Sequence, residues 1–120
     1  MVDNFQRAVR RWVIDCFGLE ASSYRKERTF RFLEEALELA QSCAASHEEV
    51  QALVEYVFSR PVGEFTSELG GTMTTLAALA DAYDTSAVGA GWIELAKNRK
   101  RIAQIREKWL AKTIKTGSLP

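Results

Sequence analysis

Three glutamates with a metal-binding pattern are the residues of this 120-residue chain that are best suited to chemistry. Glu35 and Glu38 stand three positions apart in an apolar segment, and Glu68 opens another apolar run thirty residues after Glu38. Side chains at i and i+3 leave a helix on the same side, so the first two carboxylates repel each other unless a cation lies between them. Oxygen ligands suit Mg²⁺, which keeps several waters and needs few protein ligands. The pattern therefore predicts a divalent-cation site suited to phosphate chemistry.

Each of these carboxylates also has a purely structural interpretation. Glu68 lies in the first turn of an expected helix, where the helix dipole favours a negative charge. Glu34, Glu35 and Glu38 would form an ordinary solvated face if Arg31 or Lys26 paired with them. Taken singly, each residue is better explained by structure. The ExxE pair followed by a second acidic helix start favours the metal site when the clusters are taken together.

Composition excludes several other kinds of site. Sixteen basic and sixteen acidic residues give no net charge, whereas a general nucleic-acid binder normally carries a basic surplus. Cys16 and Cys43 are far apart and fall at apolar positions, which predicts buried free thiols rather than zinc ligands. His47 is the only histidine, so it alone would have to support histidine-based catalysis. The polar N-terminus has no apolar signal segment, and no apolar run is long enough to span a bilayer. We expect a soluble, cytoplasmic protein that binds neither nucleic acid nor membrane.

Five helices are predicted to position the acidic residues. The first is capped by Asp3 and ends at Gly18. A capping box formed by Ser46 and Glu49 starts the third helix, which breaks at Pro61 and Gly63. The helical segments are expected at about 3–17, 24–45, 46–60, 66–83 and 87–112, with 1–112 forming one domain and 113–120 a flexible tail.

Apolar residues at helical spacing predict which helix faces form the core. The second helix is expected to be central, because it carries a broad apolar stripe. The predicted core faces comprise Phe30, Leu33 and Leu37 in the second helix, Val50, Leu53, Val54, Val57 and Phe58 in the third, Leu69, Met73, Leu76, Leu79 and Tyr83 in the fourth, and Trp92, Leu95, Ile102, Ile105 and Trp109 in the last. No segment alternates like a strand, so the fold class is all-α, a bundle of four or five helices.

The chain resembles the MazG-like all-α nucleoside triphosphate pyrophosphohydrolases over most of residues 5–112. That family carries an ExxE motif on one helix, which matches Glu35 and Glu38, and an ExxD motif on the next long helix, which matches Glu68 only in part. The run that follows Glu68 (LGGTMTTLAALA), the basic segment around Asn98 and the opening FQRAVRRW are also similar to the family in character. Only the acidic motifs are specific.

Gly71 departs from the family pattern, because it stands where the second motif would place an aspartate. Glycine has no side-chain ligand, so one carboxylate of four is missing. Three carboxylates could still hold one Mg²⁺, and Glu34 is a reserve ligand. The alternative is a catalytically impaired relative that binds nucleotides, or a helical interaction module without turnover.

The resemblance implies hydrolysis of (d)NTP between the α and β phosphates, giving (d)NMP and pyrophosphate, as a housekeeping activity on the nucleotide pool. Mg²⁺, with Mn²⁺ as a substitute, would be held by Glu35, Glu38 and Glu68, which are also the expected catalytic residues. A homodimer or homotetramer is expected. Basic groups would clamp the polyphosphate, although a solvated helix face explains any single one better. The substrate-binding candidates are Lys97, Asn98, Lys100, Arg101, Arg28 and Arg31, and Trp12 as a base-stacking residue, for which a core role is preferred.

Overall fold

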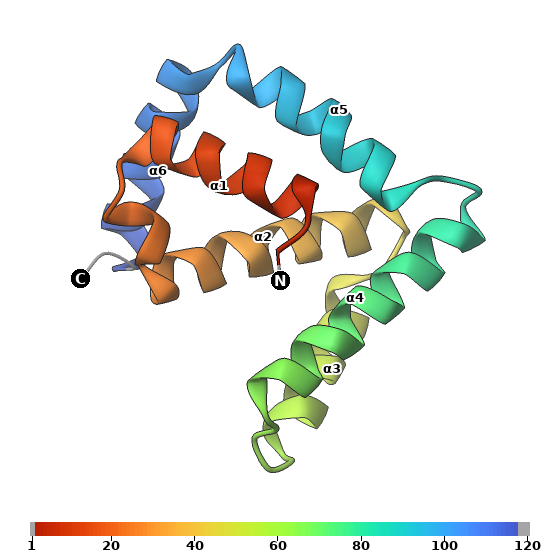
Figure 1. Cartoon of the computed structure of the whole chain (residues 1–120). Helices are drawn as coiled ribbons and strands as arrows, with labels where there is room; N and C mark the ends of the chain where they lie inside the picture. The colour runs from red at the N-terminus through yellow and green to blue at the C-terminus, as the bar shows by residue number, and fades with distance from the viewer. Residues whose placement is uncertain (1, 118–120) are drawn as a thin grey trace.

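The computed structural model describes residues 2–117, and these residues form an all-α protein (Figure 1). In chain order the elements are α1 (Asn4–Phe17), the short 3-10 helix η1 (Ala21–Ser23), α2 (Arg25–Ser42), α3 (His47–Phe58), α4 (Phe65–Ala82), α5 (Ala87–Arg99) and α6 (Ile102–Thr116). The predicted all-α class is confirmed. Within this described part of the chain, none of the helices has both the length and the apolar character needed to cross a membrane.

The helix starts and stops expected from capping residues are present. The Asp3 side chain accepts a hydrogen bond from the Gln6 amide at 2.8 Å and so caps α1. Ser46 Oγ accepts from the Glu49 amide at 3.1 Å, and Glu49 Oε1 accepts from the Ser46 amide at 2.8 Å. Gly18 ends α1 with φ at 93°, a conformation that favours glycine. These ends are set by local chemistry, which is why the sequence predicts them.

The helix expected over 87–112 is in fact two helices, separated at Lys100 and Arg101. No glycine or proline marks the break, so nothing local predicts it. Arg106 supplies the physical reason, because its Nε donates to the carbonyl oxygen of Cys16 at 2.5 Å. This contact holds α6 across the C-terminal end of α1, where a straight continuation of α5 would not lie. The prediction of one last helix was therefore wrong.

The predicted start of the C-terminal tail was also too early. The helix α6 continues to Thr116, and Thr113, placed at the start of the tail, is buried. Its hydroxyl donates to the carbonyl oxygen of Leu110 at 3.0 Å, which lets a polar side chain be buried without a lost hydrogen bond. The remainder of the predicted tail, at 118–120, lies outside the described residues.

A small core gathers around α1, which packs against η1, α5 and α6. Its buried apolar residues are Val13, Cys16, Ala21 and Leu95. Aromatic pairs extend this core from both ends of α1: Phe5 with Trp92, Trp12 with Phe17, and Phe17 with Trp109 at 4.8 Å between ring centroids. Gly91 allows the first pair, because a Cβ there would lie 2.6 Å from the Phe5 ring. We call residues 2–43 and 83–117 the body.

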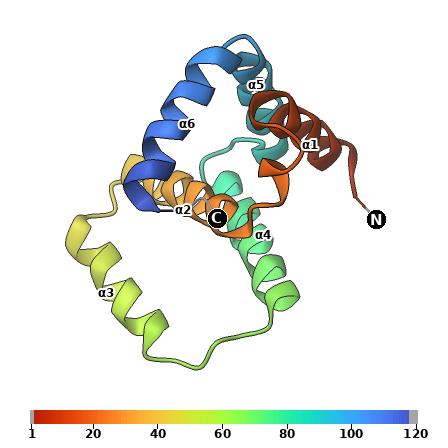
Figure 2. The ribbon, with the colours of Figure 1, turned by 90° about the vertical axis from the view of Figure 1, so that its left-hand side faces the viewer.

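The helices α3 and α4 project from the body, and we call residues 47–82 the arm (Figures 1 and 2). At its base the Tyr83 side chain is hydrogen-bonded to Cys43, which raises the pKa of Tyr83 and links the ends of α4 and α2. No residue of α3 or α4 is buried. The core faces predicted for the arm are therefore wrong for a single chain, and so are those of Leu33 and Leu37 in α2, since these apolar side chains are largely exposed.

Candidate functional site

Glu35 and Glu38 lie together on α2, as their spacing predicts. The pKa of Glu35 is raised above its ordinary value, first by partial desolvation and then by the carboxylates of Glu38 and Glu34. Lys112 opposes this shift and Glu94 adds to it. Desolvation and the neighbouring carboxylate of Glu38 both disfavour the charged form of Glu35.

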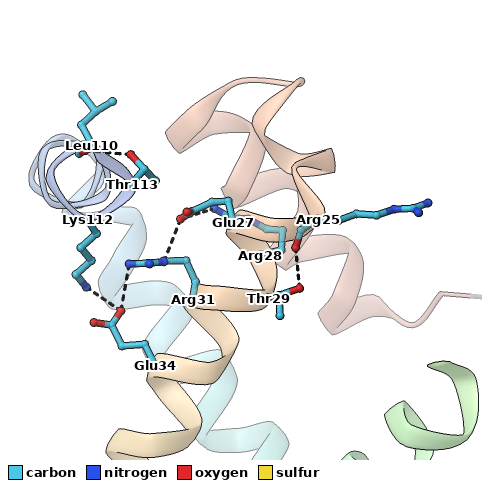
Figure 3. Close-up of polar contacts among 9 residues, drawn as sticks. All are labelled: Arg25, Glu27, Arg28, Thr29, Arg31, Glu34, Leu110, Lys112 and Thr113. Atoms are coloured by element: carbon cyan, nitrogen blue, oxygen red, sulfur yellow. Dashed lines mark hydrogen bonds and ion pairs between the residues drawn. The ribbon is translucent and has the colours of Figure 1, made fainter. Parts of the chain in front are cut away.

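Glu34 differs from Glu35 and Glu38 because it already forms ion pairs with two basic side chains. Its Oε1 lies 3.0 Å from Lys112 Nζ and 3.4 Å from a guanidinium nitrogen of Arg31 (Figure 3). Lys112 comes from α6, so this ion pair joins α6 to α2. A carboxylate engaged with two cations is a poor metal ligand, and the reserve role predicted for Glu34 has no support in this geometry.

Arg28 and Arg31 both face Glu27, which is fully buried (Figure 3). Arg31 Nε lies 3.0 Å from Glu27 Oε1, and Arg28 Nη2 lies 3.6 Å from the same oxygen. Arg28 also lies over the Phe17 ring, 5.3 Å from its centroid. These contacts give both arginines a structural role in the body, whereas the sequence predicts that they bind phosphate.

Glu68 lies apart from the Glu35 and Glu38 pair. It is in the first turn of α4, and α4 begins at the outer end of the arm (Figure 2). The Glu68 carboxylate lies next to Gly63, in the connection that joins α3 to α4. A Cβ added at Gly63 would lie 2.5 Å from Glu68 Oε1, so the glycine makes room for this carboxylate. Across residues 2–117, no three acidic, histidine or cysteine side chains are grouped closely enough to hold a metal ion. One chain does not assemble the predicted triad.

Gly71 occupies an open position one turn after Glu68. A Cβ added there would meet nothing within 4 Å, so the local structure would accept an aspartate. The carboxylate is therefore missing only because residue 71 is a glycine, and not because the surrounding structure lacks room for an aspartate.

The predicted phosphate-binding residues of the last helix lie around the break between α5 and α6. Lys97 is largely exposed and lies 3.9 Å from Glu94, a weak surface ion pair. Asn98 is half-buried, whereas Lys100 and Arg101 are exposed at the break itself. These two cations are accessible to a bound anion.

Trp12 has the core role that its position in an apolar stripe predicts. The indole is half-buried, and its ring packs edge-on against Phe17 with the centroids 6.1 Å apart. Stacking on a nucleotide base has no support in this arrangement.

Glu94 is a neighbour of the acidic pair that the sequence does not reveal. It lies on α5, in the segment that the sequence marks as basic, yet its charge acts on Glu35. The two residues are 59 positions apart, and only the packing of the helices brings their charges within range. No spacing signal could have found it.

The residues of α2 fit a divalent cation in chemical type. Glu35 and Glu38 supply oxygen ligands, and desolvation together with the Glu38 carboxylate raises the pKa of Glu35. Mg²⁺ is commonly held by one or two carboxylates together with substrate phosphates. The pair is therefore sufficient to begin a metal site, although not to enclose one.

No protein-family model matches the chain, and neither the curated proteins nor the solved structures include a significant match to it.

Proposed function

We propose that this protein is a Mg²⁺-dependent nucleoside triphosphate pyrophosphohydrolase of the MazG-like all-α type, cleaving (d)NTP to (d)NMP and pyrophosphate. The observation that supports the proposal best is the Glu35 and Glu38 pair, with a raised pKa at Glu35 caused by desolvation and by Glu38. A cation bound between the two carboxylates would remove the repulsion that raises this pKa. The same two residues carry the ExxE resemblance.

The proposed reaction breaks the anhydride bond between the α and β phosphates. Water adds to the α phosphorus, the bridging oxygen leaves with pyrophosphate, and the water's proton is released to a carboxylate or to solvent. Mg²⁺, or Mn²⁺ in its place, would neutralise phosphate oxygens and lower the pKa of a bound water. Glu35 and Glu38 would hold the ion, with Glu68 as a third ligand. Lys100 and Arg101 would bind the outgoing phosphates.

The setting of this activity is part of the proposal. The substrate is a free nucleotide, not a nucleic acid or a membrane component. We expect the enzyme to act in the cytoplasm on the nucleotide pool, as a homodimer or homotetramer.

The test is a pyrophosphate-release assay over the common NTPs and dNTPs with Mg²⁺ and with Mn²⁺. Glu38→Gln should reduce the rate by at least about 100-fold, because it replaces a metal ligand with a neutral group of the same size. Glu107→Gln, an exposed change on α6, is the matched control and should leave the rate unchanged. If no substrate releases pyrophosphate even at enzyme concentrations close to that of the nucleotide, the catalytic proposal is wrong.

A non-catalytic relative that binds nucleotides, or a helical interaction module, is the second candidate, and Gly71 is the observation that favours it. Calorimetric titration with Mg²⁺ and a non-hydrolysable nucleotide separates binding from turnover. Binding of the nucleotide without any pyrophosphate release would support this candidate. Gly71→Asp, which the open position can accept, should then increase Mg²⁺ affinity.

A further inference from the structure

This chain exposes more accessible surface than a compact protein of the same mass. Its accessible area is 9605 Å², whereas a compact monomer of 13.5 kDa is expected to expose about 6,500 Å². The radius of gyration is 15.5 Å, against about 13.6 Å for a compact domain of 120 residues. The excess is about 3,000 Å², and a stable interface covers about 800 Å² on each partner. The chain therefore has enough surplus surface for a large interface.

Each of the two arm helices exposes an apolar face. In α3, Leu53 is 62% exposed and Val57 is 56% exposed, although their spacing is that of a buried stripe. In α4, Met73 is 60% exposed and Leu69 is 49% exposed. An isolated helix of 12 residues, the length of α3, is marginal in water even with favourable residues. The arm needs another surface to cover this face.

The threonine hydroxyls of α4 need no hydrogen-bond acceptor from outside the helix. The hydroxyls of Thr72, Thr74 and Thr75 donate to backbone carbonyls of the preceding turn of α4, each at 2.9 Å. Each hydroxyl proton is satisfied within the helix, so covering it would leave no donor without an acceptor.

The charges of the arm and the body are opposite. Residues 47–82 contain six acidic side chains and a single basic one, Arg60. The rest of the chain contains fifteen basic and ten acidic side chains. A neutral chain is thus divided into a negative arm and a positive body, so the net charge of an arm attracts the body of a second copy, whereas Glu34, Glu35 and Glu38 on α2 itself oppose the approach of Glu68.

The helix α2 offers the exposed apolar surface that the arm could cover. Phe32 and Leu39 are half-exposed and lie one turn before and one turn after Glu35 on the same side of the helix. Leu33 and Leu37, which also belong to its predicted core face, are exposed to a similar degree. Glu35 therefore lies beside apolar surface that a folded protein would normally bury.

We propose that a second copy of this chain covers the arm, with the apolar face of α3 and α4 packing on the exposed face of α2 of the other copy. The two copies exchange arms about a two-fold axis, so each supplies a negative arm and receives one. This arrangement would cover the apolar stripes of α3, α4 and α2 at the same time. The helix faces that the sequence predicts to be buried would then be buried between the two copies.

The exchange also bears on the third glutamate. Glu68 stands at the outer end of the arm, away from α2 of its own chain, and an exchanged arm carries it to α2 of the other copy. We infer that each site combines Glu35 and Glu38 of one copy with Glu68 of the other. This second part rests on the proposed function, whereas the covering of the arm does not.

The covering of the arm is tested by the mass in solution, measured by light scattering on the full chain without nucleotide or metal. The expected mass is about 27 kDa, twice the 13.5 kDa of one chain. Leu53→Glu with Val57→Glu should give a monomer. Ile114→Glu, the same kind of change at an exposed apolar position of α6, is the control and should remain dimeric. A monomeric wild-type chain would overturn the proposal, and so would a dimer that survives both changes in α3.

The placement of Glu68 is tested by crosslinking, which does not depend on activity. Chains with Glu38→Cys and chains with Glu68→Cys, each also carrying Cys43→Ser, are mixed and treated with a short bis-maleimide. A covalent dimer should form in the mixture and not from either chain alone. If the double variant Glu38→Cys with Glu68→Cys instead crosslinks within one chain at high dilution, the glutamates meet in the same copy and the second part is wrong.

Activity gives an independent readout if the protein turns over nucleotides. Glu38→Gln and Glu68→Gln chains, each inactive alone, should recover about a quarter of the wild-type rate when mixed, because half of the dimers are mixed and each of these has one intact site. A site within one chain would recover nothing. Crosslinking without any turnover would reject the proposed function and leave the exchanged dimer standing.

Discussion

The body and the arm are built from helices of similar length and amphipathic pattern, yet only the body has a core. In the body, α1 is held by aromatic pairs at both ends and by Arg106, which reaches the last carbonyls of α1 from α6. In the arm, α3 and α4 carry regular apolar stripes with no buried residue. An apolar stripe therefore shows that a helix needs a partner, and specific polar and aromatic contacts decide whether that partner is in the same chain.

The strongest test of this comparison removes a polar contact that the body has and the arm lacks. Glu27→Gln takes the charge from a fully buried carboxylate, 3.0 Å from Arg31, and leaves the guanidinium groups of Arg28 and Arg31 without it. We expect a loss of about 3 kcal/mol in unfolding free energy, the lower end for a buried pair because the arginines are partly exposed. The measurement is the urea midpoint.

Glu94→Gln is the matched control for Glu27→Gln. It breaks the exposed pair with Lys97 and should cost less than about 0.5 kcal/mol. An equal loss of unfolding free energy in the two variants would show that buried polar contacts are not what distinguishes the body from the arm.

A smaller effect is expected from the cap of α3 in the arm. Ser46→Ala removes the capping box and should destabilise α3 by about 1 kcal/mol. Hydrogen exchange should then quicken in α3 and not in α1. Asp3→Ala, which removes the cap of α1, should quicken hydrogen exchange in α1 and not in α3. An unchanged α3 in Ser46→Ala would mean that the covering of the arm, and not its cap, decides its stability.

The capping box also predicts a response of the arm to pH. The hydrogen bonds from Ser46 lower the pKa of Glu49 below its ordinary value. Because the folded-state pKa is the lower one, this contribution is present above the ordinary glutamate pKa and is lost as the pH falls through the lowered value. Acidification should therefore lower the protection factors of α3, that is, exchange rates corrected for their intrinsic pH dependence, and should lower them by less in Glu49→Gln, which has no carboxylate to protonate, than in the wild type.

The smallest effect is expected at the acidic pair of α2. The pKa of Glu35 is raised above its ordinary value of 4.5. The contribution of Glu35 to folding stability is therefore complete below pH 4.5 and is lost as the pH rises through the raised pKa. Glu35→Gln should slightly increase the melting temperature at neutral pH and leave it unchanged below 4.5. Added Mg²⁺ should reduce the difference at neutral pH by stabilising only the wild type. A melting temperature that falls at neutral pH would show that Glu35 is compensated after all.

The sequence predicts those features that depend on neighbours along the chain. The caps at Asp3 and Ser46 and the placement of Glu35 and Glu38 on one helix follow from local spacing, and the structure contains all of them. The break between α5 and α6 depends on Arg106 reaching Cys16, 90 positions away, so no local pattern announces it.

In the candidate site, too, only the features that depend on local spacing could be predicted from the sequence. The ExxE pair could be found from spacing, whereas the action of Glu94 and Lys112 on Glu35 depends on where the fold places α5 and α6 relative to α2. The separation of Glu68 from the pair depends on the direction in which the arm leaves the body. Apolar periodicity identifies the face of each helix that should be buried, but it does not say which chain will bury it.

Cys16 gives the body a built-in measure of how often it opens. Burial raises the pKa of its thiol, and only the thiolate reacts with alkylating reagents, so modification must await an opening that exposes α1 to solvent. Cys43, at the base of the arm, is half-buried. Comparing the alkylation rate of Cys16 with that of the partly accessible Cys43 would therefore yield the opening free energy of the body, without any engineered label.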